Sequence, residues 1–249
     1  MGHPAQSNSS SAQPTKHPAS LYDALWTEAE LLDYRIWPIW EKLSKYVSPT
    51  GRRLEIGCGI APKIPSPGSY FVDLSPPALK KLEAQGGLST AADGGILPFI
   101  DNCFEVVVSA AVLEHIENDQ TALCEVARVL RPNGYLMLGI PVGMQYWTHF
   151  DEVVGHYRRY SAEHIEHLLA GAGLAIRSFS AYRIFHGHRV ANLMAYFITR
   201  YPRFSWWATK KFLLPRRLQT RLEWSDRDFH QCLKDATDVH ILAQKIVGQ

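Results

Sequence analysis

The 249-residue sequence is poor in cysteine and lacks cysteine pairs. Its four cysteines are widely scattered and form no Cys-x-x-Cys motif: Cys58, Cys103, Cys124 and Cys232. This spacing excludes a disulfide framework and a zinc knuckle, and it is typical of a protein kept in a reducing compartment. We therefore expect a cytoplasmic location.

The sequence also lacks a long apolar run and an excess of either charge. Its longest apolar run, residues 190–198, is interrupted by Asn192 and is far shorter than the roughly 20 residues that cross a bilayer. The 26 basic and 24 acidic residues give a formal net charge of +2. A balance this even does not indicate a dedicated nucleic-acid-binding protein, so we expect no nucleic-acid partner.

Strand-like and helix-like segments alternate along the chain. Strand character occurs at residues 53–56, 70–73, 106–109 and 135–140, and helical periodicity occurs at 121–130 and 162–169. Two further strands are predicted at 174–179 and 239–245. Alternating strands and helices predict an α/β fold, with a parallel sheet that has helices on both faces.

Composition divides the chain into five parts. Residues 1–20 are rich in Ser, Pro, Gln and Ala and are predicted to be a disordered tail. Residues 21–50 carry apolar side chains at helical spacing and are predicted to form a helical cover, broken near Pro38. We expect the core over residues 51–182, a helical lid or insert over 183–236, and the final strand of the core over 237–249.

The first predicted strand ends in a Gly-x-Gly turn, Gly57 to Gly59. Such a turn lets the backbone approach a ligand that a Cβ would obstruct, and Asp73 ends the next strand, where a carboxylate can bind a ribose diol. The third glycine of a dinucleotide site is missing, because the chain continues Ile60-Ala61-Pro62. This argues against a pyrophosphate site and a nicotinamide dehydrogenase. S-adenosylmethionine carries no phosphate, and Asp93 offers a polar group for its adenine amine.

Six motifs occur in a fixed order: Leu54-Glu55-Ile56-Gly57-Cys58-Gly59, Val72-Asp73-Leu74-Ser75, Ala92-Asp93-Gly94 through Leu97-Pro98-Phe99, Phe104-Glu105-Val106-Val107-Val108-Ser109, Leu113-Glu114-His115-Ile116, and Glu125 to Gly134. Over residues 52–174 they resemble a class I S-adenosylmethionine-dependent methyltransferase of the type 11 domain family. The resemblance implies a Rossmann-like, mostly parallel seven-stranded sheet with an antiparallel last strand, N-terminal helices and a helical insert before that strand.

The resemblance also implies the donor site. The methyl donor would be S-adenosylmethionine, and the product left after transfer would be S-adenosylhomocysteine. The residues implied to bind the donor are Glu55, Gly57, Cys58, Gly59, Asp73, Leu74, Asp93, Gly94, Ser109, Ala110 and His115. One departure concerns the segment after Gly59. The family usually has a helix there, but Pro62, Pro65 and Pro67 make a regular helix very unfavourable.

The loop after the 135–140 strand is where an acceptor should enter, since ligands bind beyond the carboxyl ends of parallel strands. Methyl transfer from a sulfonium needs an aligned acceptor and a group that removes its proton. Imidazole titrates close to neutral pH, so His149 and His156 are candidate bases, with His149 preferred. Asp151 is the third predicted catalytic residue, because its carboxylate could orient a histidine or accept a hydrogen bond from a sugar hydroxyl.

A metal requirement is not expected. His149, Asp151 and His156, or the His186-Gly187-His188 segment, could hold a divalent ion bound by vicinal hydroxyls. Their spacing matches no recognisable ligand motif, so we assign no metal ligand.

We therefore expect a methyltransferase acting on an oxygen of a small hydroxylated metabolite, sugar or polyketide, as a monomer or homodimer. The insert mixes aromatic and basic residues, which are most simply interpreted as ordinary core and a solvated face. A lid, a dimer interface and a peripheral membrane contact are the other interpretations. A lipid-linked acceptor and a non-catalytic, donor-binding regulatory subunit are the alternatives to the main function.

Overall fold

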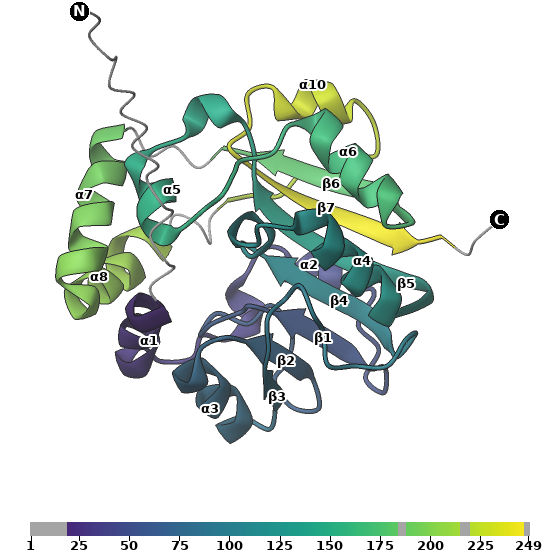
Figure 1. Cartoon of the computed structure of the whole chain (residues 1–249), viewed down its shortest axis with the longest axis horizontal. Helices are drawn as coiled ribbons and strands as arrows, with labels where there is room; N and C mark the ends of the chain where they lie inside the picture. The colour runs from purple at the N-terminus through teal and green to yellow at the C-terminus, as the bar shows by residue number, and fades with distance from the viewer. Residues whose placement is uncertain (1–18, 184–187, 215–219, 247–249) are drawn as a thin grey trace, which may run out of the picture.

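A seven-stranded sheet forms the centre of the computed structural model, which describes residues 19–183, 188–214 and 220–246 (Figure 1). The strand order is β3-β2-β1-β4-β5-β7-β6. Neighbouring strands from β3 to β5 are parallel, and β7 runs antiparallel to β5 and β6. The strands are β1 Arg53–Ile56, β2 Tyr70–Asp73, β3 Leu88–Ala91, β4 Phe104–Ala110, β5 Leu130–Pro141, β6 Leu174–Tyr182 and β7 Asp238–Lys245. The predicted fold class is confirmed.

Helices cover both faces of this sheet. The helical elements are α1 Ala19–Glu28, η1 Tyr34–Ile36, α2 Trp40–Leu43, α3 Pro76–Ala84, η2 Leu113–His115, α4 Asp119–Val129, η3 Met144–Tyr146, α5 His149–Val154, α6 Ala162–Gly171, α7 His188–Arg200, α8 Pro202–Ala208, η4 Thr209–Leu213 and α10 Phe229–Leu233. Apolar side chains of α4, α6 and α10 pack on one face, and those of α2 and α3 pack on the other. Burial of these side chains is the main source of stability.

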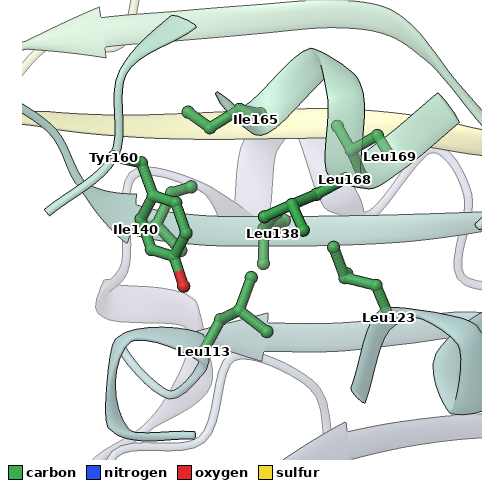
Figure 2. A pocket seen from close by; sticks show the side chains of 8 residues that line it. All are labelled: Leu113, Leu123, Leu138, Ile140, Tyr160, Ile165, Leu168 and Leu169. Atoms are coloured by element: carbon green, nitrogen blue, oxygen red, sulfur yellow. The ribbon is translucent and has the colours of Figure 1, made fainter. Parts of the chain in front are cut away.

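The larger core is closed to ligands. Side chains from η2, α4, β5 and α6 meet in an apolar cluster around Tyr160 (Figure 2). The gap between them does not admit a water molecule. Ligand binding must therefore occur elsewhere on the molecule.

Local signals in the sequence account for several element boundaries. Serine is a favoured N-cap residue, and the Oγ of Ser161, at the start of α6, accepts a hydrogen bond from the His164 backbone N–H at 3.2 Å. No helix forms between β1 and β2, a segment that the structure describes in full. The three prolines in that segment explain this, as predicted.

The structure differs from the sequence-based prediction at two places. β3 and its preceding helix α3 were not predicted, because β3 lies at the sheet edge and none of its residues is buried. The sequence Arg131-Pro132-Asn133-Gly134 predicts a left-handed residue at Gly134, but Asn133 has φ +63° instead. Gly134 is needed for space, since a Cβ there would lie 2.8 Å from the Arg131 carbonyl oxygen.

The N-terminal helix and the insert lie beside each other. α1 packs against α3 and α8, while α7 packs against α5 and α8 (Figure 1). Within the described ranges, no helix is long and apolar enough to cross a membrane. Residues 1–18 of the predicted tail lie outside the described residues.

Candidate active site at the carboxyl edge of the sheet

Five parallel strands, β3, β2, β1, β4 and β5, end at one edge of the sheet. The strand order reverses between β1 and β4, and crevices at such points bind ligands in open α/β sheets. The register places Ile56 of β1 opposite both Val72 of β2 and Ser109 of β4. The turns that follow these strands, which carry the predicted donor residues, therefore lie at the same edge.

The turn after β1 requires glycine at two positions. Gly57 has φ +63° and Gly59 has φ +53°, a region that costs other residues free energy. Space is also restricted: a Cβ on Gly57 would lie 2.6 Å from a methyl of Val112, and one on Gly59 would lie 2.9 Å from the Trp26 ring. Cys58, between the two glycines, is buried. Larger side chains are therefore excluded at both glycines of this turn.

Asp73 links this turn to the end of β2. Its Oδ2 accepts a hydrogen bond from the Gly59 backbone N–H at 2.8 Å, and its Oδ1 accepts one from the Ser75 N–H at 2.9 Å. Burial raises the pKa of this carboxyl above its usual value, although the backbone hydrogen bonds oppose the rise. Leu74 beside it keeps 67% of its side chain exposed. An acidic group and an apolar surface are thus available side by side for a ribose and a base.

The turn after β3 completes the donor side. Gly94 lies close to the end of β1, because a Cβ there would be 3.1 Å from both Ile56 and Ile116. Asp93 is exposed, and its Oδ1 accepts a hydrogen bond from the Gly95 N–H at 2.7 Å. The predicted donor residues of β1, β2 and the β3 turn are therefore brought together.

Glu55 has a different setting from its neighbours. It is 1% exposed, and its carboxylate accepts hydrogen bonds from the backbone N–H groups of Lys63 and Ile64. Burial raises its pKa to about 7, against the opposing charge of Lys63. These hydrogen bonds hold the proline-rich segment against the end of β1. Glu55 therefore fixes the position of a segment that borders the site.

Beyond β4 the chain makes a sharp turn. Ser109 is buried, and Ala111, two residues after it, has φ +59°. Backbone strain of this kind persists only where the surroundings impose it, and the Ala111 N–H is fixed by the Gly139 carbonyl at 2.8 Å. The turn after Ala110 leads directly into η2, which carries Glu114 and His115.

Helix α1, within the segment predicted to be a helical cover, lies over the donor side. Trp26 lies on Gly59, and the Tyr22 ring contacts His115 edge-on at 6.2 Å. The Tyr22 hydroxyl donates to the Val154 carbonyl at 3.0 Å. No motif marks these aromatic residues, since their role depends on a packing contact that is distant in sequence.

Asp151 organises the acceptor side. It is fully buried. Its Oδ1 accepts a hydrogen bond from His156 Nδ1 at 2.9 Å, and two guanidinium nitrogens of Arg159 also contact this oxygen. Its Oδ2 accepts from the Thr148 N–H and hydroxyl. Burial alone would raise the Asp151 pKa, but the hydrogen bond from His156 and the charge of Arg159 lower it to about 2. Asp151 is therefore ionised at neutral pH and holds the imidazole in one orientation.

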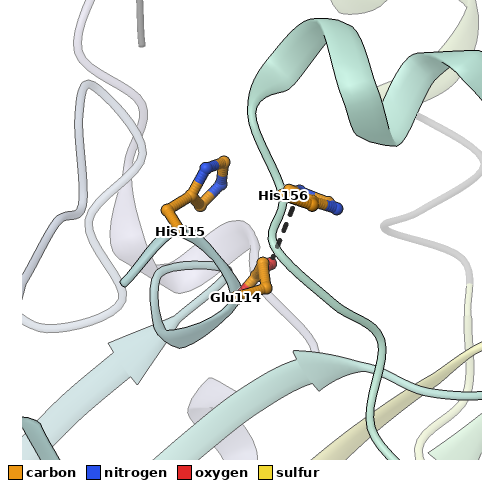
Figure 3. A group of neighbouring side chains, drawn as sticks. All are labelled: Glu114, His115 and His156. Carbon is orange, nitrogen blue, oxygen red and sulfur yellow. Dashed lines mark ion pairs between the residues drawn. The ribbon is translucent and has the colours of Figure 1, made fainter. Parts of the chain in front are cut away.

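Three side chains meet at the end of β4. Glu114, His115 and His156 each bring one ligand-type atom within 4.8 Å of the others (Figure 3). His156 Nε2 lies 3.8 Å from Glu114 Oε1, and the two imidazole rings contact edge-on at 4.6 Å. Burial raises the pKa of Glu114 to about 7. The sequence motif contained Glu114, but nothing in the motif indicated that it would face His156.

His149, the other histidine that was predicted as a base, lies apart from this cluster. His149 is 59% exposed, and its Nδ1 pairs with the exposed Glu152 at 2.9 Å. Of the alternative metal-binding segment, residues 186 and 187 and the side chain of His188 lie outside the described residues. The structure thus brings Asp151 and His156 together and leaves His149 on the surface of α5.

Glu114 should make the stability of the protein depend on pH. Because its pKa is about 7 when folded and about 4.3 when unfolded, the folded state holds an extra proton between these values, and stability falls as pH rises through this window. Glu114→Gln mimics the protonated carboxyl. Thermal melts from pH 5 to 8 should show the variant gaining up to about 3 kcal/mol over the wild type. Parallel stability curves would show that the carboxyl is already ionised at pH 5.

Comparison with known proteins agrees with this geometry. Residues 54–138 match the family model described as a methyltransferase domain. An uncharacterized methyltransferase of Mycobacterium marinum is 25% identical over 224 residues, covering 82% of this chain and 86% of the relative. A tRNA (carboxymethyluridine(34)-5-O)-methyltransferase of Schizosaccharomyces pombe is 30% identical over 115 residues, 45% of this chain. The chain spans only 50% of the length of that relative.

Solved structures share the fold. The YcgJ protein of Bacillus subtilis has a TM-score of 0.60 at 16% identity, covering 85% of this chain and 99% of that one. The [4+2]-cyclase SpnF has a TM-score of 0.59 at 18% identity, covering 92% and 95%. A neighbour named for another reaction illustrates that the fold does not fix the chemistry. Residues 54–138 thus carry a methyltransferase domain, and the ordered motifs and the strand order resemble those of the class I S-adenosylmethionine-dependent methyltransferases.

Proposed function

We propose that this methyltransferase acts on a hydroxyl oxygen of a small molecule and that His156 removes the hydroxyl proton. When bound, S-adenosylmethionine supplies an electrophilic methyl group. The glycine turn supports a donor site here, because its left-handed backbone and its close contacts with Val112 and Trp26 leave no room for larger side chains at the carboxyl end of β1. Asp73 would hold the ribose, Leu74 and Asp93 the adenine, and Ser109, Ala110 and His115 would lie near the methionine end.

The orientation of His156 carries the proposal. An ionised Asp151 can only accept hydrogen bonds, so the His156 Nδ1 that it contacts must carry a proton. The second nitrogen, Nε2, is then basic and faces the residues at the end of β4. In the transfer, His156 Nε2 would accept the hydroxyl proton while the acceptor oxygen takes the methyl group that a bound S-adenosylmethionine would supply. The sulfonium would thereby become the neutral thioether of S-adenosylhomocysteine.

An assay with labelled methyl donor tests the proposal. The wild-type protein would be incubated with labelled S-adenosylmethionine and a panel of hydroxylated metabolites, sugars and polyketides, with matched amines and with transfer RNA. Label in hydroxylated small molecules supports the proposal. Label in amines would exclude oxygen as the acceptor atom, and donor binding without turnover on any acceptor would favour a regulatory subunit.

Transfer RNA is included because of the relatives. Two of them, from Schizosaccharomyces pombe and Arabidopsis thaliana, are named as tRNA methyltransferases whose modification is at an oxygen. Their names support oxygen as the acceptor atom. They match only 45% and 50% of this chain, so a small acceptor remains our proposal, and label in transfer RNA would overturn it.

A chelator should leave methyl transfer unchanged. Although Glu114, His115 and His156 are close enough to share an ion, our mechanism uses the Nε2 of His156 as a base, and a metal would occupy that nitrogen. Activity would be measured before and after EDTA treatment. Loss of activity that is restored by Mg²⁺ or Mn²⁺ would instead indicate that an ion in this cluster binds the acceptor oxygen.

A further inference from the structure

Helices α7 and α8 present large apolar side chains to solvent. Six of them keep between 45% and 56% of their surface exposed: Val190, Leu193, Tyr196, Tyr201, Phe204 and Trp207. We call these six residues the apolar face. Isolated exposed apolar residues are ordinary, but a contiguous group of this kind marks an interaction surface.

Ring contacts make the apolar face continuous across the two helices. Tyr196 contacts Tyr201 at 6.4 Å, and Phe204 contacts Trp207 at 5.6 Å. Phe197 joins the two pairs, since its ring lies 5.2 Å from that of Phe204. The apolar face therefore runs from α7 to the end of α8.

The arrangement of α7 is the reverse of that expected for a helix surrounded by water. It buries the small Ala191 and Ala195 and exposes the larger Val190, Leu193 and Tyr196. Helices on the surface of soluble proteins normally turn their larger apolar side chains toward the core. The exposed side of α7 thus has the composition of a buried one, and no part of the described ranges 19–183, 188–214 and 220–246 covers it.

The stretch of sequence that carries the apolar face is basic. Between Arg183 and Leu222 the sequence has nine lysine and arginine residues and no aspartate or glutamate, whereas 17 basic residues face 24 acidic ones elsewhere. Arg200 is exposed at the end of α7, and Lys211 Nζ lies 5.1 Å from the centre of the Trp207 ring. Arg203 and Lys210 pair with acids outside this stretch, Glu28 and Glu30.

We propose that the apolar face docks this enzyme on an anionic phospholipid membrane. Apolar and aromatic side chains would enter the boundary between headgroups and acyl chains, while the surrounding basic residues would contact anionic headgroups. The inference does not depend on which acceptor is methylated. The geometry also connects the surface to the active site, because α7 packs on α5, which carries Asp151, and α8 packs on α1, which covers the glycine turn.

Two other occupants fit the observations less well. A second copy of the chain would bring two basic stretches without acids against each other, which is electrostatically unfavourable. An RNA strand would use the basic residues and could stack on aromatic rings. Val190 and Leu193 offer nothing to a phosphate or a base, yet they form one end of the apolar face.

Vesicle sedimentation tests the proposal with the full chain. We expect binding to vesicles that contain phosphatidylglycerol, weaker binding to phosphatidylcholine alone, and a decrease with added salt. The double variant Leu193→Ser/Trp207→Ser should reduce partitioning by at least about 10-fold. Ile100→Ser, which alters a 75% exposed apolar residue outside the insert, is the matched control and should bind like the wild type.

Each remaining outcome would overturn the proposal. Absence of vesicle binding by the wild type would exclude a membrane partner. A dimer in sedimentation velocity that the double variant dissociates would identify a second copy, and a transfer RNA complex that the double variant abolishes would identify RNA. All variants should retain affinity for S-adenosylhomocysteine, so a folding defect or a failed donor site is recognised separately.

Discussion

Replacing Asp73 with alanine should weaken S-adenosylhomocysteine binding on the order of 100-fold, or about 3 kcal/mol. The carboxylate is expected to accept hydrogen bonds from the ribose, and bonds to a charged group contribute more than neutral ones. The Gly59 N–H donates a hydrogen bond to this carboxylate at 2.8 Å, so removing the carboxylate would also leave that N–H without this partner. Both losses act on the same turn, which makes this one of the two largest effects expected.

Calorimetric titration would measure this effect. Asp226→Ala is a suitable control, because that acid is exposed and pairs only weakly with its neighbour Arg227 at 3.9 Å. The control should bind like the wild type, and neither protein should bind NADH. Undiminished affinity of a folded Asp73→Ala protein would place the donor away from the end of β2.

Replacing His156 with glutamine should lower kcat by about 10²- to 10³-fold and leave S-adenosylhomocysteine affinity nearly unchanged. The amide cannot take a proton, but its similar size preserves packing beside the buried Asp151. Asp151→Asn should lower kcat in the same direction, because a neutral partner no longer fixes the imidazole orientation. The assay would use whichever acceptor the labelled panel identifies.

His149→Gln provides the matched control for this variant. Both histidines pair with a carboxylate through Nδ1, at 2.9 Å in each case. They differ in position, since His149 is 59% exposed and His156 is 11% exposed. A large loss of kcat with His149→Gln, and none with His156→Gln, would reverse the assignment.

The donor side could be predicted in some detail because its signals are local. A glycine turn after an apolar strand and an acid at the end of the next strand specify geometry within a few residues. The structure places Gly57, Gly59 and Asp73 at one edge, as their order in the chain implies. The edge strand β3 escaped prediction for the opposite reason: it has no buried residue to leave a pattern.

The acceptor side could be predicted only as a set of candidates. Two histidines close in sequence have the same local chemistry, and only the fold buries one of them. His156 is distinguished by Glu114, which approaches it from a segment 42 positions earlier in the chain, and by the buried Asp151, which Arg159 also contacts. Trp26, 33 positions before Gly59 in the chain, covers the glycine turn through a contact of the same non-local kind.

The most direct test of the account is a carbon-13 NMR spectrum of the product made from S-adenosylmethionine labelled in its methyl group. The methyl resonance reports the atom to which the group is bound. We expect an O-methyl signal with the wild type, a signal reduced at least about 100-fold in rate of appearance with His156→Gln, and unchanged donor affinity in that variant. A methyl bound to nitrogen or carbon, or equal rates for the two proteins, would contradict the proposed chemistry.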